Sequence, residues 1–216
     1  MKIKSYLVFI VLYKYSASNL YAIEPEIFVQ STVNRASKIL SEDIEKEKKM
    51  LELQKIAKDT VDIKGIGFYT LGSIRKNLKE DQKKEYGNLF EKYFLKSFSS
   101  RLAEYTNPEI DVLGKEILSE KYTIVNSLLK GTAERPEIKI DWRIYTKNKD
   151  KPLIRDLIIE GLSLARTQKE EFNSVLQSNN NDITELFKTL ESFIKNWLNF
   201  LVGPPGLEPG TNTLWV

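Results

Sequence analysis

The spacing of apolar residues divides the chain into helices, then strands, then helices again. Apolar residues recur every three to four positions over Glu26–Ile56, Phe68–Leu78 and Asp81–Tyr105. That period is typical of amphipathic helices. The segment Val61–Gly67, which contains Gly65 and Gly67, interrupts the pattern between the first two segments, so we expect a break in the helical structure there.

Four segments with the pattern of strands follow. Ile138, Ile140, Trp142 and Ile144 alternate with polar residues, which predicts a half-buried strand. The next segment is apolar on both faces, which places it inside a sheet. The expected strands are Glu109–Leu118, Tyr122–Lys130, Glu137–Thr146 and Pro152–Glu160. Because the breaks between them are short, we expect an antiparallel meander.

Two helices are expected after these strands. Gly161 lets the chain turn, and the period then becomes helical over Leu162–Ser178. A last helix begins at Asp182, where Glu185 three residues later predicts a capping box. The order of elements predicts an α+β fold, with a twisted four-stranded antiparallel sheet packed by helices.

The two ends of the chain differ from this central domain, residues 23–202. Residues 1–22 combine early lysines, a short apolar run and small residues near Ala22, which is typical of an export signal. A short buried helix or a misassigned start codon is the alternative. Residues 203–216 are rich in Pro and Gly, which favours a disordered appendage over a docking peptide.

Charge gives no indication of a nucleic-acid partner. The chain has 33 Lys and Arg against 30 Asp and Glu, for a net charge of +3. Cleavage after Ala22 would remove three Lys and no acid, which balances the two signs. The basic run Lys46–Lys49 contains Glu47, so we interpret it as a solvated helix face. We therefore expect no binding to nucleic acid.

Composition removes the commonest catalytic sites. The chain has neither His nor Cys, which excludes Ser-His-Asp and Cys-His nucleophile systems, zinc clusters of the usual type and disulfides. Asp141 and Asp156 on neighbouring strands are the remaining acid/base candidates. Lys139 and Arg143 share the face of Asp141, and Arg155 adjoins Asp156, so cross-strand ion pairs on a solvated face are the simpler interpretation.

The segment Asp81–Tyr105 carries an aromatic stripe. Its members recur at helical spacing: Tyr86, Phe90, Tyr93, Phe94, Phe98 and Tyr105. Such a stripe is usually core. Bulky strand residues opposite bulky helix residues also favour a retained apolar hollow, which an acyl chain would fill. Both interpretations stay open at this stage.

Seven segments resemble the MlaC (toluene-tolerance auxiliary) family. They are Val61–Gly72, Asp81–Tyr86, Phe90–Phe94, Leu102–Tyr105, Ile138–Arg143, Asp156–Leu164 and Gln168–Phe172. The turn Glu160-Gly161-Leu162-Ser163-Leu164, with Phe172 eight residues later, is the most specific of them. The resemblance extends over about Glu26 to Leu201. Lys79 stands where the family often has Ser or Thr, and the Pro/Gly tail has no family counterpart.

The resemblance implies a soluble, non-enzymatic periplasmic carrier of phospholipid. Such a protein moves lipid between an outer-membrane lipoprotein complex and an inner-membrane ABC transporter. The implied fold encloses an apolar pocket for acyl chains between a twisted sheet and helices. No cofactor is expected beyond the phospholipid cargo, and headgroup specificity is expected to be weak.

From the stripe, the strands and the resemblance we expect a set of apolar residues to line this pocket. They are Phe68, Leu71, Tyr93, Phe94, Leu102, Tyr105, Ile140, Trp142, Ile144, Ile158 and Leu164. Two alternatives are kept. One is a scaffold with a solid core that only docks other envelope proteins, and the other is a small carboxylate enzyme built on Asp141 or Asp156.

Overall fold

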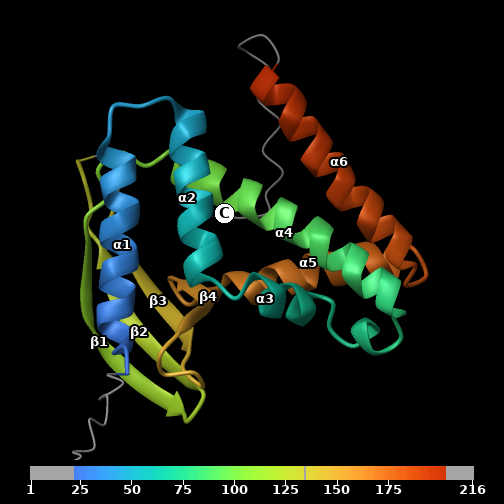
Figure 1. Ribbon diagram of the computed structural model, residues 1–216, viewed down its shortest axis with the longest axis horizontal. Coiled ribbons are helices and arrows are strands. Elements are labelled where there is room, and N and C mark those ends of the chain that lie inside the picture. The colour runs from blue at the N-terminus through green and yellow to red at the C-terminus, as the bar shows by residue number, and fades with distance from the viewer. Residues whose placement is uncertain (1–21, 134, 203–216) are drawn as a thin grey trace, which may run out of the picture.

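The chain forms six α-helices and one antiparallel sheet in the part that the structure describes, residues 22–133 and 135–202 of a computed structural model (Figure 1). Four helices come first: α1 (Pro25–Ser41), α2 (Lys46–Thr60), α3 (Ile63–Thr70) and α4 (Glu80–Leu102), with a 3₁₀ turn η1 (Ile74–Lys76) before α4. The α+β prediction is confirmed. The export signal and the Pro/Gly tail lie outside the described residues, apart from Ala22.

The sheet is a meander in which every strand pairs with its neighbours in the chain. Its strands are β1 (Ile110–Ser119), β2 (Tyr122–Leu129), β3 (Ile138–Tyr145), β4 (Leu153–Ile159) and the two-residue β5 (Leu162–Ser163), all antiparallel. The four expected strands are present within one residue at each end. The fifth was not expected, because two residues are too short to show a period.

A tight turn joins β4 to β5 and starts the next helix. Glu160 and Gly161 have φ values of 49° and 82°, and two positive values in succession are those of a type I′ hairpin turn. Leu162 and Ser163 pair with β4, so α5 spans Leu164–Ser178 rather than beginning at Leu162. The Ser163 hydroxyl accepts from the Arg166 N–H at 3.1 Å and caps that helix.

The segment Glu26–Ile56 is two helices where the apolar period predicts continuous helical structure. The chain leaves the helical conformation between Ser41 and Lys46. Lys49 Nζ donates to the Leu40 carbonyl at 2.9 Å, which satisfies an acceptor left open at the end of α1. The two helices therefore lie side by side, as Figure 1 shows.

The expected break over Val61–Gly67 is present only at Val61 and Asp62, because Gly65 and Gly67 lie inside α3. The Asp62 carboxylate caps the helix by accepting from the Gly65 N–H at 2.8 Å. A Cβ on Gly67 would lie 2.7 Å from Phe90 Cδ1. Gly67 thus allows α3 and α4 to approach closely. The expected helix Phe68–Leu78 is also wrong in its bounds, because α3 ends at Thr70 and η1 follows.

The last helix, α6 (Ile183–Val202), is capped differently from the prediction. Asp182 Oδ1 accepts from the N–H and the hydroxyl of Thr184, at 2.9 and 2.8 Å. Glu185 instead pairs with Lys188 at 2.6 Å. The expected box between Asp182 and Glu185 is therefore replaced by a cap on Thr184.

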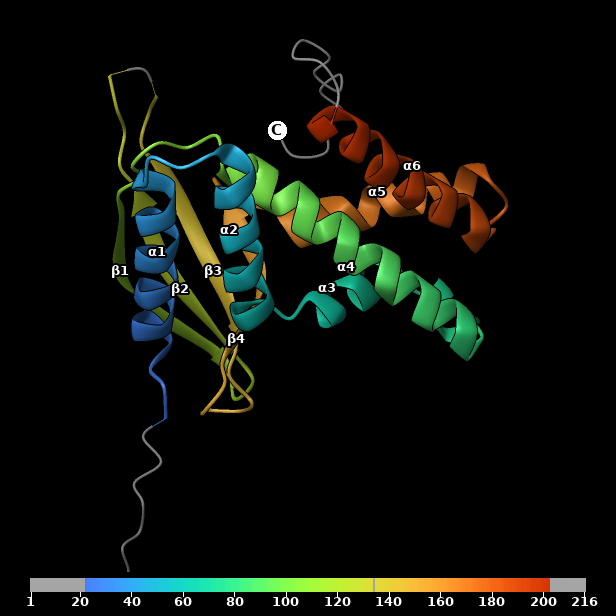
Figure 2. The same cartoon turned by 45° about the horizontal axis from the view of Figure 1, so that its top comes forward.

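The helices lie against one face of the sheet and beside it. α1 packs on β1 and β2, and α5 packs on β4, whereas α4 packs mainly on α2, α3 and α6. In Figure 2 the C-terminal end of α4 lies nearest the sheet and its N-terminal end points away from it. One buried core joins these layers, and its largest members include Tyr86, Phe90, Leu71, Ile144 and Leu186.

No helix in the described part of the chain combines the length and the apolar character needed to span a bilayer.

Candidate functional site

The aromatic stripe of α4 divides into two halves with different surroundings. In the N-terminal half, Tyr86, Phe90 and Tyr93 are at most 3 % exposed. Phe90 meets Phe172 of α5 edge-on at 6.3 Å between ring centroids. Tyr86 shares a 2.7 Å hydrogen bond with Thr70, and burial raises the pKa of its hydroxyl far above the usual range. This half of the stripe is core.

The C-terminal half of α4 keeps its apolar side chains partly exposed. Phe94 and Phe98 stack nearly parallel, with centroids 5.6 Å apart and an interplanar angle of 9°. Both are half-buried, as are Leu102 and Tyr105 farther along. Arg135, from the loop between β2 and β3, lies over the Tyr105 ring at 5.1 Å. The end of α4 near the sheet therefore presents apolar side chains that stay partly exposed.

The inner face of the sheet shows the same division. At one end, Val125, Trp142 and Ile144 are buried, and Trp142 Nε1 donates to the Ser127 hydroxyl at 2.8 Å. At the other end the register brings half-buried residues of four strands together. They are Ile110, Val112, Leu129, Ile138, Ile140, Leu157 and Ile159.

These seven residues, with Phe94 and Phe98 of α4, form what is called here the half-buried apolar surface. Phe94, Phe98, Ile140 and Leu157 also pack against the buried core, so the surface continues from it. Partial exposure of so many large apolar side chains at one end of a domain marks a binding surface more often than a solvent face.

The expected lining residues are distributed over three environments. Leu71, Tyr93, Trp142 and Ile144 are buried in the core. Another set is half-buried: Phe68, Phe94, Leu102, Tyr105, Ile140, Ile158 and Leu164. Of these, Phe94 and Ile140 belong to the half-buried apolar surface. Contact between these eleven residues and a ligand stays a prediction.

Ile158 lies on the opposite face of the sheet from Trp142. It pairs with Asp141, whereas Leu157 pairs with Trp142 and Ile159 with Ile140. The expected lining therefore includes Ile158, which faces away from Trp142, and does not include Leu157 and Ile159, which share the face of Trp142. A bulge between Arg143 and Ile144 sets this register, and an inserted residue of this kind leaves no mark in the apolar period.

The two candidate carboxylates have separate partners. Asp141 accepts from Asn126 Nδ2 at 2.8 Å and lies 3.3 Å from Lys139 Nζ. The Asp156 side chain is only 1 % exposed, so the expectation that it lies on a solvated face is wrong. The start of α5 covers it: the Ala165 N–H and the Ser163 hydroxyl both donate to it, at 3.0 and 2.6 Å.

Arg143 completes the surroundings of Asp156, at 3.3 Å across the strand pair. The carboxylate is thus used to fix β4, β5 and α5 together. Among the described residues, no three acidic side chains are grouped so as to hold a metal ion.

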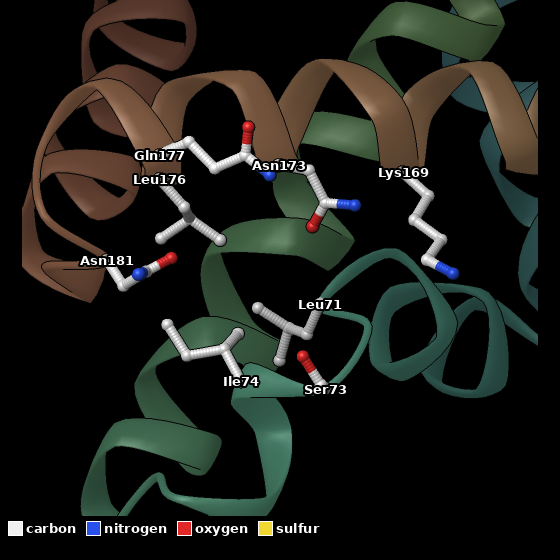
Figure 3. A pocket seen from close by; sticks show the side chains of 8 residues that line it. All are labelled: Leu71, Ser73, Ile74, Lys169, Asn173, Leu176, Gln177 and Asn181. Carbon is white, nitrogen blue, oxygen red and sulfur yellow. The ribbon is translucent and has the colours of Figure 1, made fainter.

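The hollows on the described surface include two of similar size. The first has a volume of about 280 Å³ and lies between the turn that holds Leu71, Ser73 and Ile74 and the side of α5 (Figure 3). The second, of about 330 Å³, is lined by Val61, Asp62, Ile63 and surrounding charged residues. Leu71 is the member of the expected lining that takes part in the first hollow, and the second contains none of that set.

Comparison with known proteins gives a family and several structural neighbours. The family model described as MlaC protein matches residues 30–192. The structure of a phospholipid-binding protein from Ralstonia solanacearum, in complex with a phospholipid, superposes with a TM-score of 0.68. The alignment has 16% sequence identity and covers 80% of this chain and 98% of the other. At that identity the likeness shows a shared fold. Among curated proteins nothing matches.

Proposed function

Since this chain belongs to the MlaC family, we propose that it binds phospholipid and transports it without catalysing a reaction. The fold that it shares with the phospholipid-binding protein from Ralstonia solanacearum supports the proposal. The composition agrees with it, because a carrier of acyl chains needs none of the chemistry that His and Cys provide.

The observation that carries the proposal is the half-buried apolar surface between α4 and the sheet. It gathers side chains from four strands and from α4 at one end of the domain. Each CH₂ group moved from water onto such a surface is worth about 0.8 kcal/mol, so a long acyl chain is held by apolar contact alone. The phosphate and the headgroup would remain in water.

We expect the acyl chain to enter between α4 and the sheet. α4 packs on α2, α3 and α6, whereas the strands pack on α1, α3 and α5. Phe94 and Phe98 are half-buried on the C-terminal half of α4, whose end lies nearest the sheet in Figure 2. Rotation of these two rings would widen the space between α4 and the sheet without displacing the buried Tyr86 and Phe90.

The wider role belongs to the same proposal. The protein would act in the periplasm, would be exported by residues 1–22, and would exchange lipid with an outer-membrane lipoprotein complex and an inner-membrane ABC transporter. The sequence pattern of the first 22 residues supports export, and membership of the MlaC family supports the exchange.

A docking scaffold with a solid core is the second candidate. The closed packing of Tyr86, Phe90, Trp142 and Ile144, with exposures between 0 and 9 %, favours it. The two functions differ in whether the purified protein contains lipid.

The test is mass spectrometry of an organic extract of the protein purified from bacteria that export it. A carrier should contain phospholipid in roughly stoichiometric amount. Phe98→Glu and Ile140→Glu place a charge on the half-buried apolar surface and should empty the protein. Ile117→Glu is the matched control, because Ile117 is 71 % exposed on β1 and outside that surface. Lipid-free wild-type protein would favour the scaffold instead.

A further inference from the structure

The hollow beside η1 is a polar site at a distance from the half-buried apolar surface in the fold. Leu71, Ser73 and Ile74 form one wall, and residues of α5 form the other (Figure 3). Its volume of about 280 Å³ is just below the range of about 300–1,000 Å³ of ordinary ligand sites. It therefore suits a small molecule rather than the two acyl chains of a phospholipid.

The backbone fixes the first wall of the hollow. Gly72 has a φ of +58°, which turns the chain sharply after α3. A Cβ at Gly72 would lie 3.3 Å from Lys169 Cε and 3.6 Å from Asn173 Oδ1. The turn thus approaches α5 at the point where those two side chains project.

The second wall ends in another fixed turn. Asn180 and Asn181 follow α5 with φ values of 54° and 60°. The Asn181 N–H donates to the Leu176 carbonyl at 2.7 Å, a bond that closes helices ending in this way. This conformation brings the Asn181 side chain to the edge of the hollow, as Figure 3 shows.

The polar side chains that line the hollow are all hydrogen-bond donors, and none of them is a carboxylate. One ammonium group, three amides and one hydroxyl line it, from Lys169, Asn173, Gln177, Asn181 and Ser73. Within the described residues these side chains make no hydrogen bond or ion pair; Lys169 only lies over the Tyr69 ring, at 5.2 Å. The nearby Asp182 carboxylate already accepts from Thr184.

We propose that this hollow binds a small oxyanion, with phosphate as the representative ligand. Lys169 supplies the charge, and the amide and hydroxyl groups supply directed hydrogen bonds to the remaining oxygens. Leu71, Ile74 and Leu176 form the apolar floor of the hollow, and the donors surround it, with Lys169 and Asn173 half-buried and Ser73, Gln177 and Asn181 exposed. The oxyanion has two possible sources, free phosphate or the phosphate of a lipid headgroup.

The test is a titration of the ¹⁵N-labelled full chain with inorganic phosphate at constant ionic strength, followed by NMR. The amides of Gly72, Ser73 and Asn181 should shift in a saturable way. Lys169→Gln should weaken binding by about tenfold to a hundredfold, the usual effect of losing a hydrogen bond to a charged group. Lys84→Gln removes an exposed charge from α4 and should leave the titration unchanged.

A second set of titrations distinguishes free phosphate from a lipid headgroup as the natural ligand. A second variant shows whether weaker binding results from misfolding. sn-Glycerol 3-phosphate should bind more tightly than phosphate if a headgroup is the natural ligand, and equally well or less well if free phosphate is. Asn173→Ala removes one donor while keeping a good helix former, and should weaken binding with an unchanged circular dichroism spectrum. Absence of saturable shifts with either ligand, or shifts that persist in Lys169→Gln, would overturn the proposal, whether or not the protein carries lipid.

Discussion

The Tyr93 hydroxyl donates to the Gln168 amide oxygen at 2.8 Å, and both residues are at most 3 % exposed. This buried hydrogen bond joins α4 to α5. Gln168 Nε2 in turn donates to Glu171 at 3.0 Å. A polar chain thus runs through the helical side of the core, where every donor and acceptor needs a partner.

Removal of the Tyr93 hydroxyl should destabilise the protein. Tyr93→Phe keeps the ring in the core and takes the donor from the Gln168 oxygen, which should cost about 1–3 kcal/mol. Denaturant unfolding of the two proteins measures the difference. Tyr69→Phe removes a hydroxyl from a residue that is 41 % exposed and should change little. Equal effects of the two substitutions would contradict the role of the buried bond.

Glu171, the last residue in this series of hydrogen bonds, should make the stability of the protein depend on pH. Burial raises the pKa of its carboxyl from 4.5 to about 7. The folded state therefore binds more protons than the unfolded state between these values, and its stability falls as pH rises from 4.5 to 7. Glu171→Gln should be less sensitive to pH over this range.

The measurement is the free energy of unfolding at several pH values between 4 and 8. The free energy of unfolding of the wild type should fall relative to that of Glu171→Gln as pH rises. Glu170→Gln removes an exposed carboxylate from the neighbouring position on α5 and serves as the control. Parallel pH profiles for wild type and Glu171→Gln would show that the burial of this carboxyl has no thermodynamic effect.

The meander and most helices were predictable because each depends on a local period. Ile138, Ile140, Trp142 and Ile144 alternate without interruption, and β3 follows that alternation. The alternation of apolar and polar residues along a strand determines which residues share a face of that strand. It does not fix the register between strands, so the pairing of Ile158 with Asp141 could not be read from it.

Positions that depend on a distant neighbour were predicted poorly. Gly67 has a low helix propensity, but it lies inside α3, where Phe90 of another helix leaves no room for a Cβ. Asp156 is polar and was assigned to solvent, but the start of α5 folds over it. For the candidate site, Phe94 of α4 and Ile140 of β3 belong to the half-buried apolar surface, and their contact with a ligand stays a prediction. The contributions of Leu157 and Ile159 needed the register of β4.

Asp156 should be essential for stability although it has no catalytic role in the proposed function. Asp156→Ala would remove the acceptor for Ser163 and for the Ala165 N–H, and would leave Arg143 without its partner. Hydrogen bonds to a charged group are worth about 1.5–3 kcal/mol each, and their loss is partly offset by hydration of Arg143. Unfolding experiments should therefore show a loss of about 3 kcal/mol.

An exposed acid provides the comparison for Asp156. Asp43→Ala changes a solvent-exposed residue between α1 and α2 and should alter the free energy of unfolding by less than about 0.5 kcal/mol. If Asp156→Ala were as stable as Asp43→Ala, the bonds between β4 and α5 would not contribute to the fold.

Gly67 and Gly87 should respond in opposite directions to the same substitution. Both lie inside helices, where Ala is favoured over Gly by about 0.5–1 kcal/mol. At Gly87 nothing lies within 4 Å of an added Cβ, so Gly87→Ala should stabilise the protein by that amount. At Gly67 the Cβ would meet the Phe90 ring at 2.7 Å, and Phe90 is only 2 % exposed. Overpacking of this kind costs about 1–3 kcal/mol, so Gly67→Ala should destabilise. Thermal unfolding of both variants measures the two signs, and a stabilising Gly67→Ala would mean that α3 and α4 are not in close contact there.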